Sequence, residues 1–344
     1  MKVILATSTS PFVYGGATLL FEWLEEALKQ RGHEVETYRI PVYSSPADLP
    51  GQMVGLRMWD FTGHGDRLIT IRTPSYMIRH HSKVAWFLHH HRPVYDLWDH
   101  YPDVPHDAGG REFRRMMFAS DDRALAECER VFVNSQRVGE RLMTYNGISS
   151  EVLYPPLGAS AQVDTGDLGD AIVYVSRIVP HKRQLLAVQA LAHTRTPVRL
   201  VLAGQDGGSG YAAEIFRAID ELGLLSRVTF VHTEISDASK RDLLASALGV
   251  AYIPLDEDSY GFVGLEAAAA RKALVTTSDS GGVLELVQDG VNGLVAEPDP
   301  VSLARAFDRL YEDRAAALAM GAALERRTNE LNISWDHVVS RLLA

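Results

Sequence analysis

The stretch AIVYVSRIVPHKRQLLAVQALAH, residues 171–193, holds the structural unit from which the fold is built. Its first part, AIVYVSR (171–177), is a short and mostly apolar run that is typical of a buried strand. The segment KRQLLAVQALAH (182–193) has the apolar spacing of a helix. Buried strands that alternate with helices are typical of parallel sheets covered on both faces.

The same alternation occurs in two series along the chain. The predicted strands of the first series are VILAT (3–7), RLITIRT (67–73), KVAWFLH (83–89), RVFVNS (130–135) and EVLYPP (151–156). After AIVYVSR, those of the second series are VRLVLAG (198–204), RVTFVH (227–232), GVAYIP (249–254) and ALVTTS (273–278). Helical segments separate them, such as 17–32, which ends at Gly32. The sequence therefore predicts an α/β protein with two Rossmann-like, doubly wound parallel-sheet domains facing a cleft.

The expected domains are residues 1–156 and 171–333. Between them lies the predicted linker, residues 157–170, within the stretch 154–170, which contains Pro, Gly, Ser and Asp and lacks periodicity. Ligands of such sheets bind at the carboxyl ends of the strands, so the junctions between strands and helices are where functional residues are expected.

Composition narrows the functional classes. The chain has 344 residues and a formal net charge of -10, which gives no general attraction for nucleic acid. No run approaches the roughly 18 apolar residues of a membrane span. The single cysteine, Cys128, excludes an internal disulfide and fits a reducing compartment, so we expect a cytoplasmic protein.

The first junction contains Gly15 and Gly16, directly before the predicted helix. Paired glycines let the backbone approach a ligand, and a helix N-terminus favours anions. Their spacing is not the GxGxxG of dinucleotide sites, and a plain turn explains them equally well.

The second junction carries Arg177 at the end of a strand, with Lys182 and Arg183 at the start of the next helix. Cations at a helix N-terminus oppose the macrodipole unless an anion shares the site. A diphosphate would favour this arrangement, with Arg binding through two N–H groups and Lys as a point charge. Solvated surface charge is the alternative.

The third junction is DEDSYGFVGLE, residues 256–266. Asp258 should lie just before a helix and Glu266 about two turns inside it. A buried carboxylate needs hydrogen-bond donors, and a ribose diol supplies two of them. The acids Asp256 and Glu257 are explained by the helix dipole alone.

Two further features are weaker. TTSDSGGVLELVQDG places Gly281 and Gly282 before a helix. In KVAWFLHHHRPVYD, the alternation of a strand would put His89 and His91 on one face. No third metal ligand accompanies them at a recognised spacing, so one histidine that binds a polar ligand is preferred to a metal site.

Together these junctions resemble the family 4 glycosyltransferases, which are retaining enzymes with the two-domain GT-B fold. The family's acid–seven residues–acid element is matched by Asp258-Ser-Tyr-Gly-Phe-Val-Gly-Leu-Glu266, and its Arg-x4-Lys pair by Arg177 and Lys182. Its Gly-Gly-x-x-Glu element is matched by residues 281–285, and GVNGLV (290–295) follows as in the family.

The resemblance implies a glycosyltransferase of the hexosyltransferase type that uses a nucleoside-diphosphate sugar, a hydroxyl acceptor, no cofactor and no metal. The catalytic residues that it implies are Asp258, Arg177, Lys182 and His89. The donor-binding residues that we expect are Glu266, Gly15, Gly16, Gly261, Phe262, Val263, Arg183, Gly281 and Gly282. It also implies that residues 334–344 form a terminal helix that packs back on the first domain.

The sequence departs from the family pattern in several positions. Asp258 replaces the usual Glu, Ser259 the usual Pro, and Arg271 and Ala273 the common Gly and Pro. A sugar-nucleotide-binding subunit without catalysis and a GT-B-type sugar-nucleotide epimerase therefore remain the alternatives. GREFRRMMF (110–118) is read as an ordinary amphipathic helix or as a weak contact with an anionic membrane.

Overall fold

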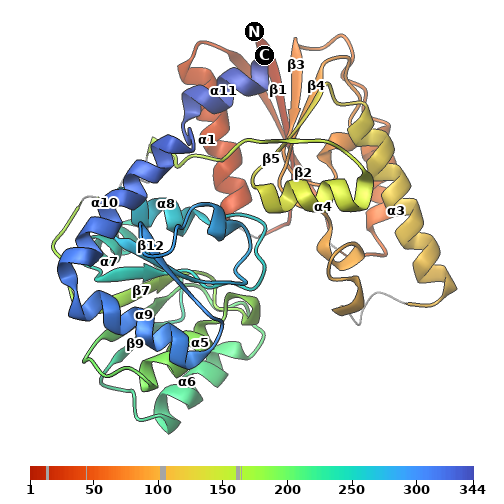
Figure 1. Ribbon diagram of the computed structural model, residues 1–344. Coiled ribbons are helices and arrows are strands. Elements are labelled where there is room, and N and C mark those ends of the chain that lie inside the picture. The colour runs from red at the N-terminus through yellow and green to blue at the C-terminus, as the bar shows by residue number, and fades with distance from the viewer. Residues whose placement is uncertain (13–14, 44, 101–105, 160–162, 164) are drawn as a thin grey trace. The chain divides into compact units, whose positions relative to one another are not determined.

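The computed structural model describes residues 1–344 except 13–14, 44, 101–105, 160–162 and 164. The chain divides into two compact units, Met1–Pro156 with Ile333–Ala344, and Leu157–Asn332. Each unit is a parallel sheet with helices packed on it (Figure 1). The predicted fold class, with two doubly wound α/β units, is confirmed.

The sheet of the first unit has six strands in the described residues, all parallel, in the order β2-β1-β3-β4-β5-β6. The strands are β1 (Lys2–Thr9), β2 (Glu34–Pro41), β3 (Arg67–Thr70), β4 (Lys83–Phe87), β5 (Arg130–Val133) and β6 (Glu151–Val152). The helices are α1 (Gly16–Gln30), α2 (Leu49–Arg57), α3 (Ala108–Ala126), α4 (Gln136–Asn146) and α11 (Trp335–Leu343), with short 3-10 turns at Ser75–Met77, Arg92–Val94 and Trp98–His100.

Two strands were not predicted. In β2, half-buried and exposed residues alternate because the strand lies at the edge of its sheet, so it lacks a continuous apolar run. The other, β12 (Gly293–Ala296), has only four residues. Both are edge strands, but β12 is mostly buried, so its short length explains why it was missed.

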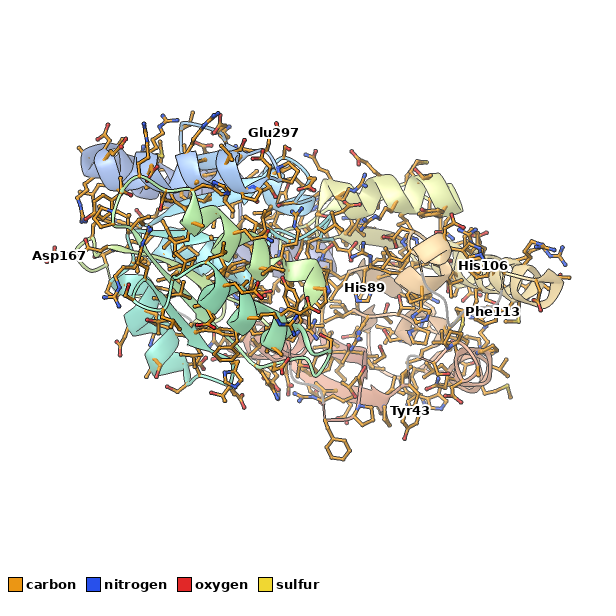
Figure 2. All side chains as sticks on the ribbon, turned by 90° about the horizontal axis from the view of Figure 1, so that it is seen from below. Tyr43, His89, His106, Phe113, Asp167 and Glu297 are labelled. Carbon is orange, nitrogen blue, oxygen red and sulfur yellow. The ribbon has the colours of Figure 1, made fainter. Side chains whose placement is uncertain are left out.

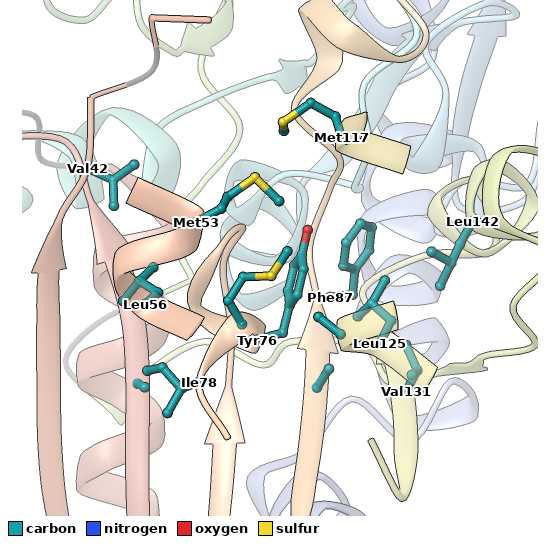
Figure 3. Packing of buried hydrophobic residues seen from close by; sticks show 14 of the residues in the cluster. Val42, Met53, Leu56, Tyr76, Ile78, Phe87, Met117, Leu125, Val131 and Leu142 are labelled. Atoms are coloured by element: carbon teal, nitrogen blue, oxygen red, sulfur yellow. The ribbon is translucent and has the colours of Figure 1, made fainter. Parts of the chain in front are cut away.

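The core of the first unit lies between its sheet and the helices α2, α3 and α4 (Figure 3). Leu56 of α2, Met117 of α3 and Leu142 of α4 reach it from three helices, and Phe87 of β4 comes from the sheet. Tyr76 packs beside Phe87 with ring centroids 5.9 Å apart. This packing fixes the ends of β3 and β4, where the histidine segment begins.

The terminal helix α11 is part of the first unit. Arg31 of α1 donates from Nε to Asp336 at 3.1 Å, and Arg67 of β3 donates to the Leu342 carbonyl at 3.1 Å. Arg341 pairs with Glu151 of β6. The helix therefore packs on the first unit, where both ends of the chain lie in Figure 1.

The sheet of the second unit also has six parallel strands in the described residues, in the order β12-β11-β10-β7-β8-β9. Besides β12, they are β7 (Ala171–Val175), β8 (Arg199–Ala203), β9 (Val228–Val231), β10 (Gly249–Ala251) and β11 (Ala273–Thr277). The helices are α5 (Gln184–Ala192), α6 (Tyr211–Glu221), α7 (Asp237–Ala245), α8 (Phe262–Ala269), α9 (Pro300–Glu312) and α10 (Arg314–Glu330), with 3-10 turns at Pro180–Lys182 and Gly282–Glu285.

The segment expected to be a linker is partly fixed. Residues 157–170 are grouped with the second unit, although 160–162 and 164 lie outside the described residues. Lys272, which is buried, donates to the carbonyls of Gly166 and Asp167 at 2.8 and 3.2 Å. The end of the segment is thus held by the unit that it enters. Among the described helices, none is long and apolar enough to cross a membrane.

Helix α10 crosses the turn after α8 at very short range, and this contact generates a stability prediction. A Cβ on Gly321 would lie 1.9 Å from the Arg271 carbonyl oxygen, whereas a Cβ on Gly55 of α2 meets nothing within 4 Å. We expect Gly321→Ala to destabilise the protein by about 2 kcal/mol or more because the helix must move away. Gly55→Ala, the matched control, should stabilise it by about 0.5–1 kcal/mol through helix propensity.

The measurement is the midpoint of thermal unfolding by differential scanning calorimetry. The Gly321→Ala midpoint should fall by about 4 °C or more, at roughly 2–4 °C per kcal/mol for a unit of this size. An unchanged or raised midpoint would show that α10 does not approach the turn this closely.

Candidate functional site

The predicted phosphate-binding residues lie at the point where the second sheet changes direction. The chain runs from β7 to β8 and β9 on one side and then crosses to β10 on the other side of β7. In open α/β sheets, ligands bind at such a point, outside the carboxyl ends of the strands, where the loops after β7 and β10 begin. The first loop carries Arg177 and Lys182, and the second carries residues 252–261.

Lys182 connects these two loops. Its Nζ donates to the Tyr252 hydroxyl at 2.9 Å and to Oε2 of Glu257, and the residue is 8% exposed. The Lys182 carbonyl accepts a hydrogen bond from the hydroxyl of Tyr174 in β7. An ammonium group has three donors, so one N–H of Lys182 is not used by these partners and can bind a ligand.

Arg177 differs from Lys182 because its side chain is exposed and no protein partner is recorded for its guanidinium within the described residues. Its backbone is fixed by Gln184, which is fully buried and donates to the Arg177 carbonyl at 2.7 Å. Burial raises the pKa of Tyr252 well above its usual value, and the nearby charge of Arg177 acts in the opposite direction. The guanidinium is therefore close to Tyr252 and accessible to an anion.

Arg183 lies just before a helix, whereas the sequence predicted it inside the first turn of that helix. The expected helix start at residue 182 is wrong: Arg183 has a left-handed backbone, with φ 55°, and α5 begins after it. Its guanidinium binds Asp279 through two nitrogens at 2.8 Å each and donates to the Ile253 and Pro254 carbonyls at 2.8 and 2.7 Å. These contacts hold the loop after β10 against the loop after β11, so the geometry favours a positioning role for Arg183.

The acids before α8 do not cap the helix. Its N-cap is Gly261, and no side chain makes a capping hydrogen bond there. The explanation of Glu257 by the helix dipole is wrong, because Glu257 instead pairs with the buried Lys182. Asp258 is also buried. The pKa of Tyr252 is raised most by burial, then by the charge of Glu257 and then by that of Asp258, so Asp258 lies close to Tyr252.

Gly261 allows the start of α8 to lie directly on Tyr252. It has a positive φ of 69°, and a Cβ there would lie 2.6 Å from the Tyr252 ring. The first N–H groups of a helix have no acceptor within it, and here they belong to Phe262, Val263 and their neighbours. Helix α8 thus begins beside the Lys182–Tyr252 contact.

Gly281 and Gly282 allow close packing against the loop that carries Glu257 and Asp258. A Cβ on Gly281 would lie 2.3 Å from the Glu257 carbonyl oxygen, and one on Gly282 would lie 2.9 Å from that of Asp258. The Gly282 N–H donates to the Glu257 carbonyl at 2.9 Å. Both glycines are required for this close backbone contact, and donor binding by them stays a prediction.

Glu266 is the fifth residue of α8, so it lies about one turn inside the helix instead of two. It is 4% exposed, and its Oε1 accepts from Nζ of Lys240 in α7 at 2.7 Å. The buried carboxylate therefore has a charged partner, which the sequence analysis did not identify. Its Oε2 has no partner recorded among the described residues.

In the first unit, Gly15 is the N-cap of α1 and Gly16 its first residue. The backbone of Gly15 is extended, with φ -164°, and a Cβ there would meet nothing within 4 Å. The protein's own packing does not require a glycine at position 15. The open space fits the predicted approach of a ligand, which stays a prediction.

The three histidines lie beyond the end of β4, so the strand alternation used to pair His89 with His91 does not apply. His89 is half-buried (labelled in Figure 2), and its Nδ1 lies 2.7 Å from the His90 carbonyl. Burial lowers the pKa of His91 to about 4, and its Nε2 has no hydrogen-bond partner within the described part of the chain. Among the described residues, no group of three or more His, Cys, Asp or Glu side chains could hold a metal ion.

Three arginines of α3 were considered for membrane contact. All three bind groups of the protein itself. Arg114 donates to the Val94 and Tyr95 carbonyls at 2.8 and 3.0 Å. Arg111 donates to the His106 carbonyl at 2.7 Å, and Arg115 pairs with Glu112. These contacts support the reading as an ordinary amphipathic helix.

Sequence reasoning missed Tyr252, Glu257 and Lys240. The signal for Tyr252 was its place directly after a buried strand on the same sheet edge as Lys182. Glu257 is next to Asp258, which was predicted, but a single sequence does not show which acidic side chain pairs with which lysine or arginine. Lys240 lies 26 residues from Glu266, and only the packing of α7 beside α8 brings them together.

Comparison with known proteins gives a family for the second unit. Residues 166–327 match the family model described as Glycosyl transferases group 1. D-inositol 3-phosphate glycosyltransferase of Mycobacterium ulcerans is 30% identical over 246 residues, which are 65% of this chain and 51% of that protein. The Mycobacterium avium protein of the same name is 32% identical over 247 residues, or 65% and 56%. The chain thus spans about half the length of the curated relatives that it matches.

Solved structures resemble the chain over its full length. Anabaena HepE in complex with UDP and glucose has a TM-score of 0.73 at 19% identity and covers 100% of this chain and 98% of its own. Sucrose-phosphate synthase of Thermosynechococcus elongatus has a TM-score of 0.75 at 18% identity, covering 98% and 97%. These similarities confirm the expected GT-B fold, and the match of residues 166–327 to the group 1 glycosyltransferase model agrees with the family predicted from the sequence.

The Lys240–Glu266 pair generates a prediction. We expect Lys240→Met to destabilise the protein by about 2 kcal/mol, because it leaves a buried carboxylate without its partner. The control is Lys29→Met, which removes a pair with Glu25 at 2.6 Å, against 2.7 Å for Lys240 and Glu266, at side chains that are more exposed. That change should cost about 0.5 kcal/mol or less.

Urea unfolding of both variants measures the difference, and the double variant Lys240→Met/Glu266→Leu should recover most of the loss. Equal effects of the two lysine substitutions would contradict a buried, coupled pair.

Proposed function

Because residues 166–327 belong to the glycosyl transferases group 1 family, we propose that the chain transfers a sugar from a nucleoside-diphosphate sugar to a hydroxyl acceptor with retention of configuration. The observation that carries this proposal is the cation pair at the switch point of the second sheet. Arg177 is exposed there, and Lys182 is held by Tyr252 and Glu257 with one N–H left for a ligand. Two cations at the carboxyl edge of the sheet, one of them held in place, suit a diphosphate.

In the proposed reaction, the bond between the sugar C1 and the diphosphate oxygen breaks, and a bond forms from C1 to the acceptor oxygen. The acceptor hydroxyl releases its proton, and the nucleoside diphosphate leaves with the negative charge that develops on it. Arg177 and Lys182 stabilise this charge, together with the N–H groups at the start of α8. The network holds Lys182 before the ligand arrives, so little reorganisation is needed.

Glu266 is the proposed partner of the ribose diol. Its carboxylate is buried in the first turns of α8, and Lys240 donates to its Oε1. A ribose hydroxyl can donate to Oε2, as in other nucleotide-binding folds with an acid at this place. Asp258, which is buried near Tyr252, is proposed to bind the sugar hydroxyls.

The remaining predicted residues receive more limited roles. His89 is proposed to bind a hydroxyl of the sugar, and the backbone at Gly15 and Gly16 to approach the donor. Arg183, Gly281 and Gly282 are proposed to position the loop that carries Asp258, because their contacts are with that loop.

We propose that the reaction uses no cofactor and no metal, because Arg177 and Lys182 supply two positive charges where the diphosphate would bind. The proposed acceptor group is a hydroxyl, which belongs to a glycan, a lipid-linked sugar or a small molecule. A cytoplasmic location belongs to the same proposal, since a chain with a single cysteine fits a reducing compartment.

The diphosphate site is tested by removing its exposed cation. We expect Arg177→Ala to weaken UDP binding about 10- to 100-fold, because a charge-assisted contact to the diphosphate is lost. UMP, which lacks the second phosphate, should be affected less. The matched control is Arg217→Ala, at an exposed arginine of α6 in the same unit.

Isothermal titration calorimetry with UDP and UMP gives the affinities, and release of UDP from UDP-glucose gives turnover. Donor binding without turnover on any hydroxyl acceptor would favour a binding subunit over an enzyme. If Arg177→Ala and Lys182→Met both bound and turned over the donor normally, the diphosphate assignment would be wrong.

The ribose site is tested by a change in the ligand. The wild-type chain should bind UDP about 10-fold or more tightly than 2′-deoxy-UDP, because one hydrogen bond to a charged acceptor is missing. Glu266→Gln should reduce this preference, and Glu25→Gln, at an ion-paired glutamate of α1 in the first unit, should not. Competition binding of the two nucleotides measures the preference, and equal binding to the wild-type chain would refute the role of Glu266.

A further inference from the structure

A chain of side-chain hydrogen bonds in the first unit ends at the histidine segment. Asn146, the last residue of α4, donates from Nδ2 to Oδ1 of Asp122 in α3 at 2.6 Å. The amide oxygen of Asn146 lies 2.8 Å from Nε2 of His90. His89 then places its Nδ1 2.7 Å from the His90 carbonyl, and its own carbonyl accepts from the Thr73 hydroxyl at 2.9 Å.

The acceptor groups fix the direction of each bond. A carboxylate only accepts, so the amide nitrogen of Asn146 must face Asp122 and the amide oxygen must face His90. Nε2 of His90 must therefore carry the proton. The His90 carbonyl also only accepts, so Nδ1 of His89 must donate to it.

His90 is held as part of the core. It is 2% exposed, with its ring 4.2 Å from that of Tyr95 and edge-on to Phe87 at 4.8 Å between centroids. Burial lowers the pKa of His90 to about 4, so the ring is neutral at neutral pH. Its position, and thus that of its carbonyl, is set by these rings and by Asn146.

We propose that Asn146 and His90 are positioning residues that hold His89 as the Nδ1–H tautomer, with Nε2 as a hydrogen-bond acceptor for a ligand hydroxyl. In this state, neutral His89 accepts from a hydroxyl and does not donate through Nε2 to an ether or carbonyl oxygen. Only the identity of the hydroxyl, taken as one of the donor sugar, rests on the proposed function. The tautomer depends on the first unit alone.

The test uses the full chain with ¹⁵N-labelled histidine rings and two-bond ¹H–¹⁵N correlation spectra at pH 8.5, well above the ordinary histidine pKa of about 6.5. His89→Gln assigns the His89 signals by their loss. We expect a protonated, pyrrole-type Nδ1 and a bare, pyridine-type Nε2 for His89. A protonated Nε2 in the wild-type chain would overturn the proposal without any further variant.

Asn146→Leu tests the anchor. We expect the His89 signals to move toward a mixture of both tautomers, because the His90 carbonyl is no longer held in place. The matched control is Asn329→Leu, at an exposed position of α10, which should leave the His89 signals unchanged. A pure Nδ1–H signal in a folded Asn146→Leu chain would overturn the role of Asn146.

Addition of UDP-glucose separates this inference from the proposed function. We expect UDP-glucose to shift the His89 Nε2 signal and UDP alone to leave it unchanged, since only the former carries sugar hydroxyls. If the tautomer is as stated and UDP-glucose binds without this shift, His89 does not bind the sugar and that part of the proposed function fails. The assignment of the tautomer would be unaffected.

Discussion

The contact between Lys182, Tyr252 and Glu257 is the constraint on which the candidate site depends. It joins the loops after β7 and β10. A buried ammonium is costly unless it is paired and hydrogen-bonded, and here a carboxylate and a phenol provide this. One charge therefore fixes how these two loops meet, and under the proposed function the same charge binds the diphosphate.

The surrounding loops are arranged around this contact by close backbone approach. Gly261 lets α8 start on the Tyr252 ring, and Gly281 lets the loop after β11 pair with Glu257. Arg183 ties the same two loops together through Asp279 and two carbonyls. The motif residues that seemed separate in the sequence are thus parts of one packed loop assembly at the edge of the sheet.

The sequence predicted the architecture well because buried parallel strands are continuous apolar runs. It missed β2, whose edge position removes that signal, and β12, which has only four residues. Strand ends gave the correct sheet edge for Arg177 and Lys182, but pairing between loops could not be read from spacing. Glu257 was therefore assigned to the helix dipole, Arg183 to a helix, and Lys240 was not considered, although each depends on a partner from another element.

Under the proposed function, two lysine–glutamate pairs of the second unit would let an acidic chain bind an anion. In the pair of Lys182 and Glu257, the lysine keeps an N–H for the ligand, and the glutamate holds the lysine in place. In the pair of Lys240 and Glu266 the roles are reversed, because the carboxylate keeps an oxygen and the lysine holds it. With a net charge of -10, the chain has no general attraction for a nucleotide. Recognition must then come from local pairs, in which each buried charge is held by its opposite and still offers one atom to the ligand.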